Sequence, residues 1–217
     1  MKHQSLVHVF LFLSFATFIN CSIYAQYDLF NQDYDISEQF NLPQAETKEY
    51  KEVGKLVLFN EEKHRTKLAK ELLDIKVGKK VKQEGVTNFR IYKVLASTKV
   101  MHHRLRYIFI DGNKLSKKEV KDRLTYIRSL LDKKVKFESV ARQYSMARNA
   151  RTGGDSGWFK KDETHPQFFK AATSKNRYAN EVFFVEVPEQ NWYYLVKKTY
   201  SPKPIREILV LKTLESR

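Results

Sequence analysis

The chain has 217 residues, of which 30% are charged, and a formal net charge of +15 at pH 7. This length suits one full domain with a smaller one beside it. The excess of lysine and arginine keeps the chain well solvated and favours acidic partners. A single cysteine, Cys21, excludes a disulfide framework within the chain.

The first 25 residues have the features of a secretory signal peptide. Lys2 precedes an apolar run from Val7 to Ile19, and Ala25 stands at a small-residue cleavage point. The run is shorter than the ~20 apolar residues that a transmembrane helix needs. We therefore expect cleavage after Ala25 and export of the mature chain to the periplasm.

Cys21 leaves a second interpretation open, in which the chain is cleaved just before this residue and the cysteine carries a lipid. Asn20 stands where such a cleavage site requires a small residue, which disfavours this interpretation. Cleavage after Ala25 instead leaves a mature chain without cysteine, so that neither a disulfide nor a thiol nucleophile is available.

Export also bears on the partners of this basic chain, because an exported protein does not meet nucleic acid. The positive charge then forms a solvated face, or it attracts acidic polypeptides, anionic lipid headgroups or an acidic partner surface. We expect no nucleic-acid partner.

In the first half of the mature chain, residues 26–48 mix polar and aromatic residues without periodicity, which predicts an extended, poorly ordered arm. Residues 55–59 have the apolar density of a strand. Apolar residues at spacings of four and three predict a helix over 61–75, and alternation predicts a strand over 86–96. Residues 49–100 therefore form a small α+β segment, which carries no catalytic motif.

The second half shows a longer series of elements. A strand over Leu105–Ile110 precedes a helix that begins at a capping box formed by Ser116 and Glu119. The apolar residues of this helix recur at spacings of four and three, so that one face is buried against a sheet. Two strands close the series, at Val182–Val187 and Trp192–Tyr200. This order fits an antiparallel sheet covered by helices.

Three motifs lie between these strands. Phe137–Ser145 has the pattern of a short amphipathic helix, Gly153–Phe159 reads Gly-Gly-Asp-Ser-Gly-Trp-Phe, and Pro166–Phe169 begins an aromatic-rich helix. From Leu105 to Tyr200 the chain resembles the parvulin (PpiC-type) family of peptidyl-prolyl cis-trans isomerases. The resemblance implies an α+β fold, with a parvulin-like antiparallel β-sheet covered by helices in residues 101–201. Residues 202–217 then follow as a C-terminal tail or strand.

The reaction of this family is rotation about the bond before proline, which has an activation energy of about 20 kcal/mol. A catalyst must bind the twisted amide more tightly than either planar form. It needs an apolar pocket for the proline ring, little water, and hydrogen-bonding groups around the amide. The resemblance implies that no cofactor and no covalent intermediate are involved.

The resemblance also implies which residues form the site. Two histidines of the family face each other beneath the substrate, and Tyr107 and Tyr193 occupy these places. The family's cysteine or aspartate corresponds to Ala147. These replacements keep a hydrogen-bonding aromatic residue at each end of the groove.

The proline pocket keeps the family's phenylalanine as Phe168. The family's methionine and leucine correspond to Thr164 and Ser156. Each replacement removes apolar contacts worth roughly 1.5–3 kcal/mol when fully buried, so we expect a weakened pocket and low activity. The adjacent His102 and His103 are expected at the surface, because no cysteine or carboxylate cluster joins them into a metal site.

Two functions fit these residues. The first is an exported parvulin-like isomerase that binds unfolded or proline-containing polypeptides and assists the folding of secreted or outer-membrane proteins. The alternative is a catalytically weakened or inactive binding subunit or chaperone of an export or assembly machine. The alternative rests on the lost histidines, the polar replacements in the pocket and the net charge of +15. In addition, Trp192–Tyr200 is similar to parvulin-like accessory proteins of the type IX secretion apparatus.

Overall fold

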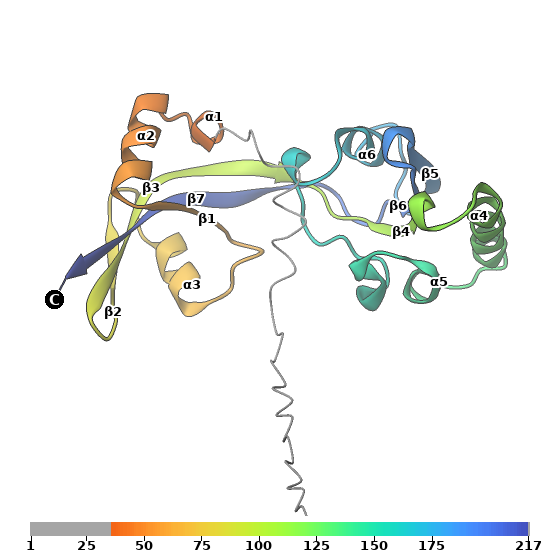
Figure 1. The fold of residues 1–217 in the computed structure, drawn as a ribbon, viewed down its shortest axis with the longest axis horizontal. Helices are drawn as coiled ribbons and strands as arrows, with labels where there is room; N and C mark the ends of the chain where they lie inside the picture. The colour runs from red at the N-terminus through yellow and green to blue at the C-terminus, as the bar shows by residue number, and fades with distance from the viewer. Residues whose placement is uncertain (1–35, 217) are drawn as a thin grey trace, which may run out of the picture.

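The computed structural model describes residues 36–216, and the expected signal peptide and the beginning of the expected arm lie outside this part. Two antiparallel sheets, one of four strands and one of three, lie at opposite ends of the molecule (Figure 1). Helices cover both sheets, which confirms the predicted α+β class. No helix in this part of the chain is long and apolar enough to cross a membrane.

The four-stranded sheet has the order β1-β7-β3-β2. Its strands are β1 (Lys55–Asn60), β2 (Lys80–Glu84), β3 (Asn88–His102) and β7 (Lys203–Ser216). The last strand therefore lies between two strands from the first half of the chain. Its consecutive apolar residues Ile208–Leu211 are all buried, as expected for a central strand that is covered on both faces.

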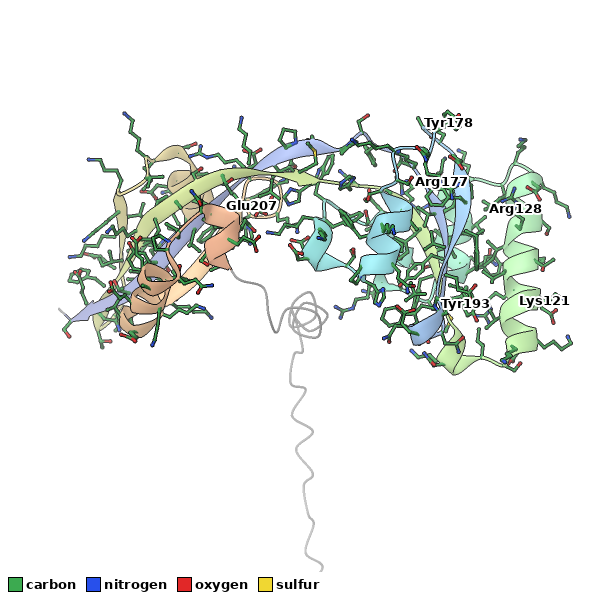
Figure 2. All side chains as sticks on the ribbon, turned by 90° about the horizontal axis from the view of Figure 1, so that it is seen from above. Lys121, Arg128, Arg177, Tyr178, Tyr193 and Glu207 are labelled. Carbon is green, nitrogen blue, oxygen red and sulfur yellow. The ribbon has the colours of Figure 1, made fainter. Side chains whose placement is uncertain are left out.

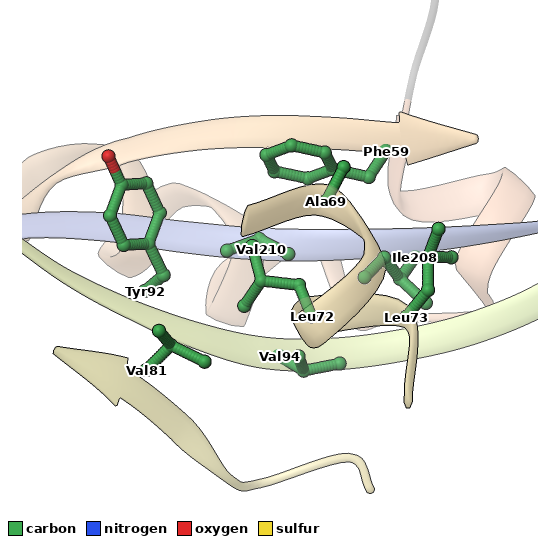
Figure 3. Packing of buried hydrophobic residues seen from close by; sticks show 9 residues of the cluster. All are labelled: Phe59, Ala69, Leu72, Leu73, Val81, Tyr92, Val94, Ile208 and Val210. Atoms are coloured by element: carbon green, nitrogen blue, oxygen red, sulfur yellow. The ribbon is translucent and has the colours of Figure 1, made fainter. Parts of the chain in front are cut away.

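One face of this sheet packs against α3 (Lys67–Asp74), whose Leu72 is fully buried among strand side chains (Figure 3). The helix is shorter than the predicted 61–75. The side-chain oxygen of Asn60 accepts hydrogen bonds from the amides of Glu62 and Lys63, which holds a turn there. Thr66 then caps the helix by accepting from the amide of Ala69 at 3.2 Å.

The opposite face is covered by α1 (Ile36–Phe40) and α2 (Gln44–Val53), as Figure 1 shows. Residues 36–48 are thus helical over most of their length, in contrast to the extended arm expected there. Burial explains the difference, because Phe40 and Thr47 are 8% and 4% exposed. Contacts with the sheet stabilise helices whose sequence has no apolar period.

The three-stranded sheet has the order β4-β6-β5. Its strands, β4 (Arg106–Asp111), β5 (Val182–Val187) and β6 (Trp192–Lys197), lie close to the predicted positions, although β6 ends before Tyr200. Two helices, α4 (Lys117–Asp132) and α5 (Phe137–Tyr144), pack on one face, and α6 (Pro166–Ala172) packs on the other. The capping box of Ser116 and Glu119 is present at the start of α4.

A buried polar network joins the four-stranded sheet to Lys160, which lies between the glycine-rich segment Gly153–Phe159 and α6. Glu207 of β7 is 1% exposed and accepts hydrogen bonds from Lys160 at 3.0 Å, Asn60 at 2.7 Å and Gln39 at 2.6 Å. The Nε2 atom of His102 lies 3.2 Å from the same carboxylate. His102 is fully buried, so its predicted place at the surface is wrong. Within residues 36–216 no cluster of metal-binding side chains is found.

Candidate functional site

The candidate site lies on β4, whose outer edge is held by the glycine-rich loop. The amide of Tyr107 donates to the carbonyl of Gly154 at 2.8 Å, and the side chain of Asn149 donates to the carbonyl of Tyr107 at 3.1 Å. Gly154 has a φ of +83°, and a Cβ atom there would lie 2.8 Å from the Tyr107 carbonyl. Glycine is therefore required where the loop meets the strand.

An ion pair fixes the same loop. Arg104 donates two hydrogen bonds to Asp155, at 3.0 and 2.7 Å. Burial on its own would raise the pKa of Asp155, but the hydrogen bonds from Arg104 and from the amide of Gly157 outweigh it and lower the pKa. The carboxylate therefore stays charged and holds the loop against the residue before β4.

Three aromatic rings converge on the face of the sheet that α6 covers. The ring of Tyr107 lies 5.6 Å from Phe168 and 5.7 Å from Tyr194, and the rings of Phe168 and Tyr194 are 4.6 Å apart. All three belong to one hydrophobic cluster, and Phe168 is 4% exposed. The structure thus brings together two of the expected site residues, Tyr107 and Phe168, and adds Tyr194.

Tyr193 does not face Tyr107, and this expectation is wrong. Its side chain packs with the cluster beneath α4 and α5, on the other face of the sheet. There its ring stacks on Phe184 at 6.2 Å, and its hydroxyl donates to Asn191 at 2.9 Å. Because successive side chains of a strand point to opposite faces, a shift of one residue exchanges Tyr193 for Tyr194.

The two phenols of the site are neutral hydrogen-bond donors at physiological pH. Burial raises the pKa of Tyr107 to about 12. Burial, and then the nearby Tyr107 and Asp111, raise the pKa of Tyr194 as well. No hydrogen bond joins either hydroxyl to another residue of the described chain. Each hydroxyl can therefore donate to the nitrogen of a twisted amide, whose lone pair is no longer shared with the carbonyl group.

The other expected pocket residues have different surroundings. The hydroxyl of Ser156 accepts from the amide of Leu105 at 3.0 Å and donates to the carbonyl of Gly157 at 2.8 Å, so that it serves the loop. The amide of Ala147 donates to Ser145 at 3.4 Å. The hydroxyl oxygen of Thr164 is buried and has no hydrogen-bond partner in residues 36–216.

The aromatic cluster extends beyond the residues that the sequence indicated. The ring of Phe109 lies 5.0 Å from Tyr194 and 5.8 Å from Trp192, and Trp192 lies 6.2 Å from His165. The missed residues Phe109, Trp192 and Tyr194 follow the alternation that begins at Tyr107, at every second position of the neighbouring strands β4 and β6. This period-two pattern was the signal that would have identified them.

The chain is similar to part of several known proteins. Over 77 residues the chain is 35% identical to the chaperone SurA of Thiobacillus denitrificans, covering 35% of this chain and 18% of that protein. It has the same identity to SurA of Burkholderia pseudomallei over 17% of that protein. The chain thus spans less than a fifth of the length of these curated relatives.

Similar solved structures include PrsA of Bacillus subtilis, with 31% identity, a TM-score of 0.35, and coverage of 46% of this chain and 35% of that one. Another is a PpiC-type peptidyl-prolyl cis-trans isomerase domain, with 23% identity, a TM-score of 0.38, and coverage of 46% and 94%. The family model of the PPIC-type PPIase domain matches residues 89–199, just over half of the chain. The chain therefore belongs to the PPIC-type (parvulin) family of peptidyl-prolyl cis-trans isomerases, as the resemblance of its motifs predicted.

Proposed function

We propose that this chain is an exported peptidyl-prolyl isomerase and chaperone that assists the folding of secreted or outer-membrane polypeptides in the periplasm. The PPIC-type domain supports the isomerase activity. The similarity to proteins named chaperone SurA supports the binding of client polypeptides. The signal-peptide pattern of the first 25 residues supports export.

The convergence of Tyr107, Tyr194 and Phe168 carries the proposal. The Phe168 ring provides the apolar surface on which a proline ring packs. The two phenols then donate hydrogen bonds to the amide that precedes the proline. These groups stabilise the twisted amide most when water is excluded, because hydrogen bonds are stronger in a medium of low dielectric constant.

Access to Phe168 limits the rate. Its side chain is 4% exposed, so a proline ring reaches it only when the surrounding aromatic side chains rotate. This burial favours the second function, in which the chain binds polypeptides as a subunit of an outer-membrane or secretion complex and turns over slowly or not at all. The two functions differ in the rate of isomerisation and not in the fold.

The test is NMR exchange spectroscopy on short X-Pro peptides with the mature chain, residues 26–217. We expect accelerated exchange between the cis and trans forms, and the loss of most of this acceleration in Phe168→Ala. Equal rates with and without the protein, together with peptide binding seen as chemical-shift changes, would favour the binding subunit.

A further inference from the structure

The outer strand of the three-stranded sheet has an unusual sequence for an edge. In the part of the chain that the structure describes, β5 has β6 as its only strand neighbour. Its six residues are Val-Phe-Phe-Val-Glu-Val, and Phe184 is 48% exposed. Exposed apolar edge strands recruit other strands, so proteins usually shield them with charges, proline or a covering element. An edge with this composition is suited to binding another strand.

A groove accompanies this edge. A cavity of about 540 Å³ lies between α4 and β5, and Leu124, Phe183, Phe184 and Leu195 form its apolar lining. The ring of Tyr193 stacks on Phe184 from below and fixes its orientation. The groove lies on the α4 face of the sheet, whereas the Phe168 cluster lies on the α6 face. The two sites therefore lie on opposite faces of the sheet, although Phe183 belongs to the Phe168 cluster and also lines the groove.

The α4 side of the groove has a net positive charge, because Lys121 and Arg128 outnumber Asp132, which also lines the cavity. Arg128 lines the cavity, and Lys121 lies seven residues earlier on the same stripe of α4 (Figure 2). Arg128 pairs with Asp132 at 3.2 Å, but both side chains are about 60% exposed, so this pair is weak. Lys121 and Arg128 are about 10 Å apart along the helix, close to the span of three or four residues of a strand.

We propose that this groove binds an extended polypeptide segment, which adds as a strand to β5. Apolar side chains of the segment pack on Phe184 and Leu124, and acidic side chains on either side of them meet Lys121 and Arg128. A second copy of this chain would bring two α4 helices and two net charges of +15 together, which disfavours it as the occupant. This proposal concerns a site distinct from the isomerase site and does not depend on its activity.

The probe is a fluorescent twelve-residue peptide without proline. Threonine occupies every second position, and the positions between face the groove. Three successive groove-facing positions carry aspartate, valine and aspartate, so that the two aspartates are four residues apart. Binding to the mature chain is measured by fluorescence anisotropy. We expect Phe184→Ser to weaken binding on the order of tenfold, because the variant loses one aromatic contact with the peptide. Tyr178→Ser, which changes an aromatic residue 80% exposed outside the groove, serves as the control and leaves affinity unchanged.

A charge reversal gives a second test that does not touch the sheet. The double variant Lys121→Glu/Arg128→Glu binds the aspartate peptide about fivefold more weakly, and it binds a peptide with lysines in place of the aspartates better than the native chain does. Phe168→Ala leaves both affinities unchanged, which separates this site from the proline pocket.

Three results would overturn the proposal. One is equal affinity of the native chain and Phe184→Ser, with both folded by circular dichroism. Another is a Lys121→Glu/Arg128→Glu variant that still binds the aspartate peptide more tightly than the lysine peptide. The third is a dimer in sedimentation experiments that Phe184→Ser converts to a monomer, because the occupant would then be a second copy of the chain.

Discussion

At the scale of single residues, the glycine-rich loop makes the most demanding contact with β4. Gly154 combines a φ of +83° with a Cβ position only 2.8 Å from the Tyr107 carbonyl and 3.0 Å from the side chain of Ala141. Gly157 has a φ of +65°, but nothing lies within 4 Å of its Cβ position. Both glycines have a backbone conformation that is unfavourable for other residues, but only Gly154 is also closely packed. A comparison of substitutions at the two positions therefore measures the effect of close packing alone.

We expect Gly154→Ala to lower the free energy of unfolding by about 2–4 kcal/mol, since the methyl group displaces the strand that carries Tyr107. Gly157→Ala is the matched control and costs about 1 kcal/mol, because only the backbone conformation is unfavourable. Urea denaturation measures both. Equal losses in the two variants would show that the loop does not press on β4.

Glu207 makes stability depend on pH. Burial raises its pKa, but the hydrogen bond from His102, the charge of Lys160 and the hydrogen bond from Asn60 together lower it to about 2 in the folded chain. The unfolded value is near 4.5. The stabilisation is thus complete above pH 4.5 and is lost as the pH falls towards 2.

Glu207→Gln removes this dependence. Between pH 6 and pH 3 the difference in unfolding free energy between the native chain and Glu207→Gln should shrink by about 2 kcal/mol, because the native chain loses stability that the variant never had. Denaturation at the two pH values measures this difference. A constant difference would mean that Glu207 keeps an ordinary pKa in the folded chain.

At the scale of elements, β7 holds the four-stranded sheet together, because it pairs with both β1 and β3. Ile208 is fully buried in this strand, whereas Leu214 near its end is 64% exposed. We expect Ile208→Ala to lower the free energy of unfolding by about 3 kcal/mol. Leu214→Ala should change it by at most about 0.5 kcal/mol. Denaturation curves compare the two, and similar losses would argue against a central position of β7.

Elements with a regular apolar spacing and a local start signal were predictable from the sequence. The capping box at Ser116 and the apolar stripe after it identify α4. By contrast, β2 contains the single apolar residue Val81 among charged and polar neighbours, and it is a strand because it pairs with β3. Such pairing depends on residues far away in the sequence, which local patterns do not contain.

The site was predictable to the same extent. The resemblance to the parvulin family pointed to Phe168 and Tyr107 as site residues. The resemblance placed Tyr193 in the site instead of Tyr194, because a shift of one residue between two adjacent tyrosines leaves the motif unchanged. The pairing of Tyr107 with Val196 decides it, since Tyr194 lies two residues before Val196 and on the same face.

At the scale of the whole molecule, the three-stranded sheet presents different chemistry on its two faces. The α6 face holds the aromatic cluster around Phe168, and the α4 face holds the groove beside β5. The buried network at Glu207 ties the four-stranded sheet to Lys160, in the segment that precedes α6. The aromatic cluster and the groove thus lie on opposite faces of one sheet.

The most direct test of the isomerase site compares Tyr194→Phe with Tyr193→Phe in NMR exchange on an X-Pro peptide. Each variant removes one hydroxyl from neighbouring positions of β6, but only Tyr194 faces Phe168. We expect Tyr194→Phe to slow isomerisation about tenfold or more, because it removes one hydrogen bond to the twisted amide. Tyr193→Phe should leave the rate unchanged. The reverse result, or equal rates in both variants, would contradict a catalytic role for the Tyr107–Tyr194–Phe168 cluster.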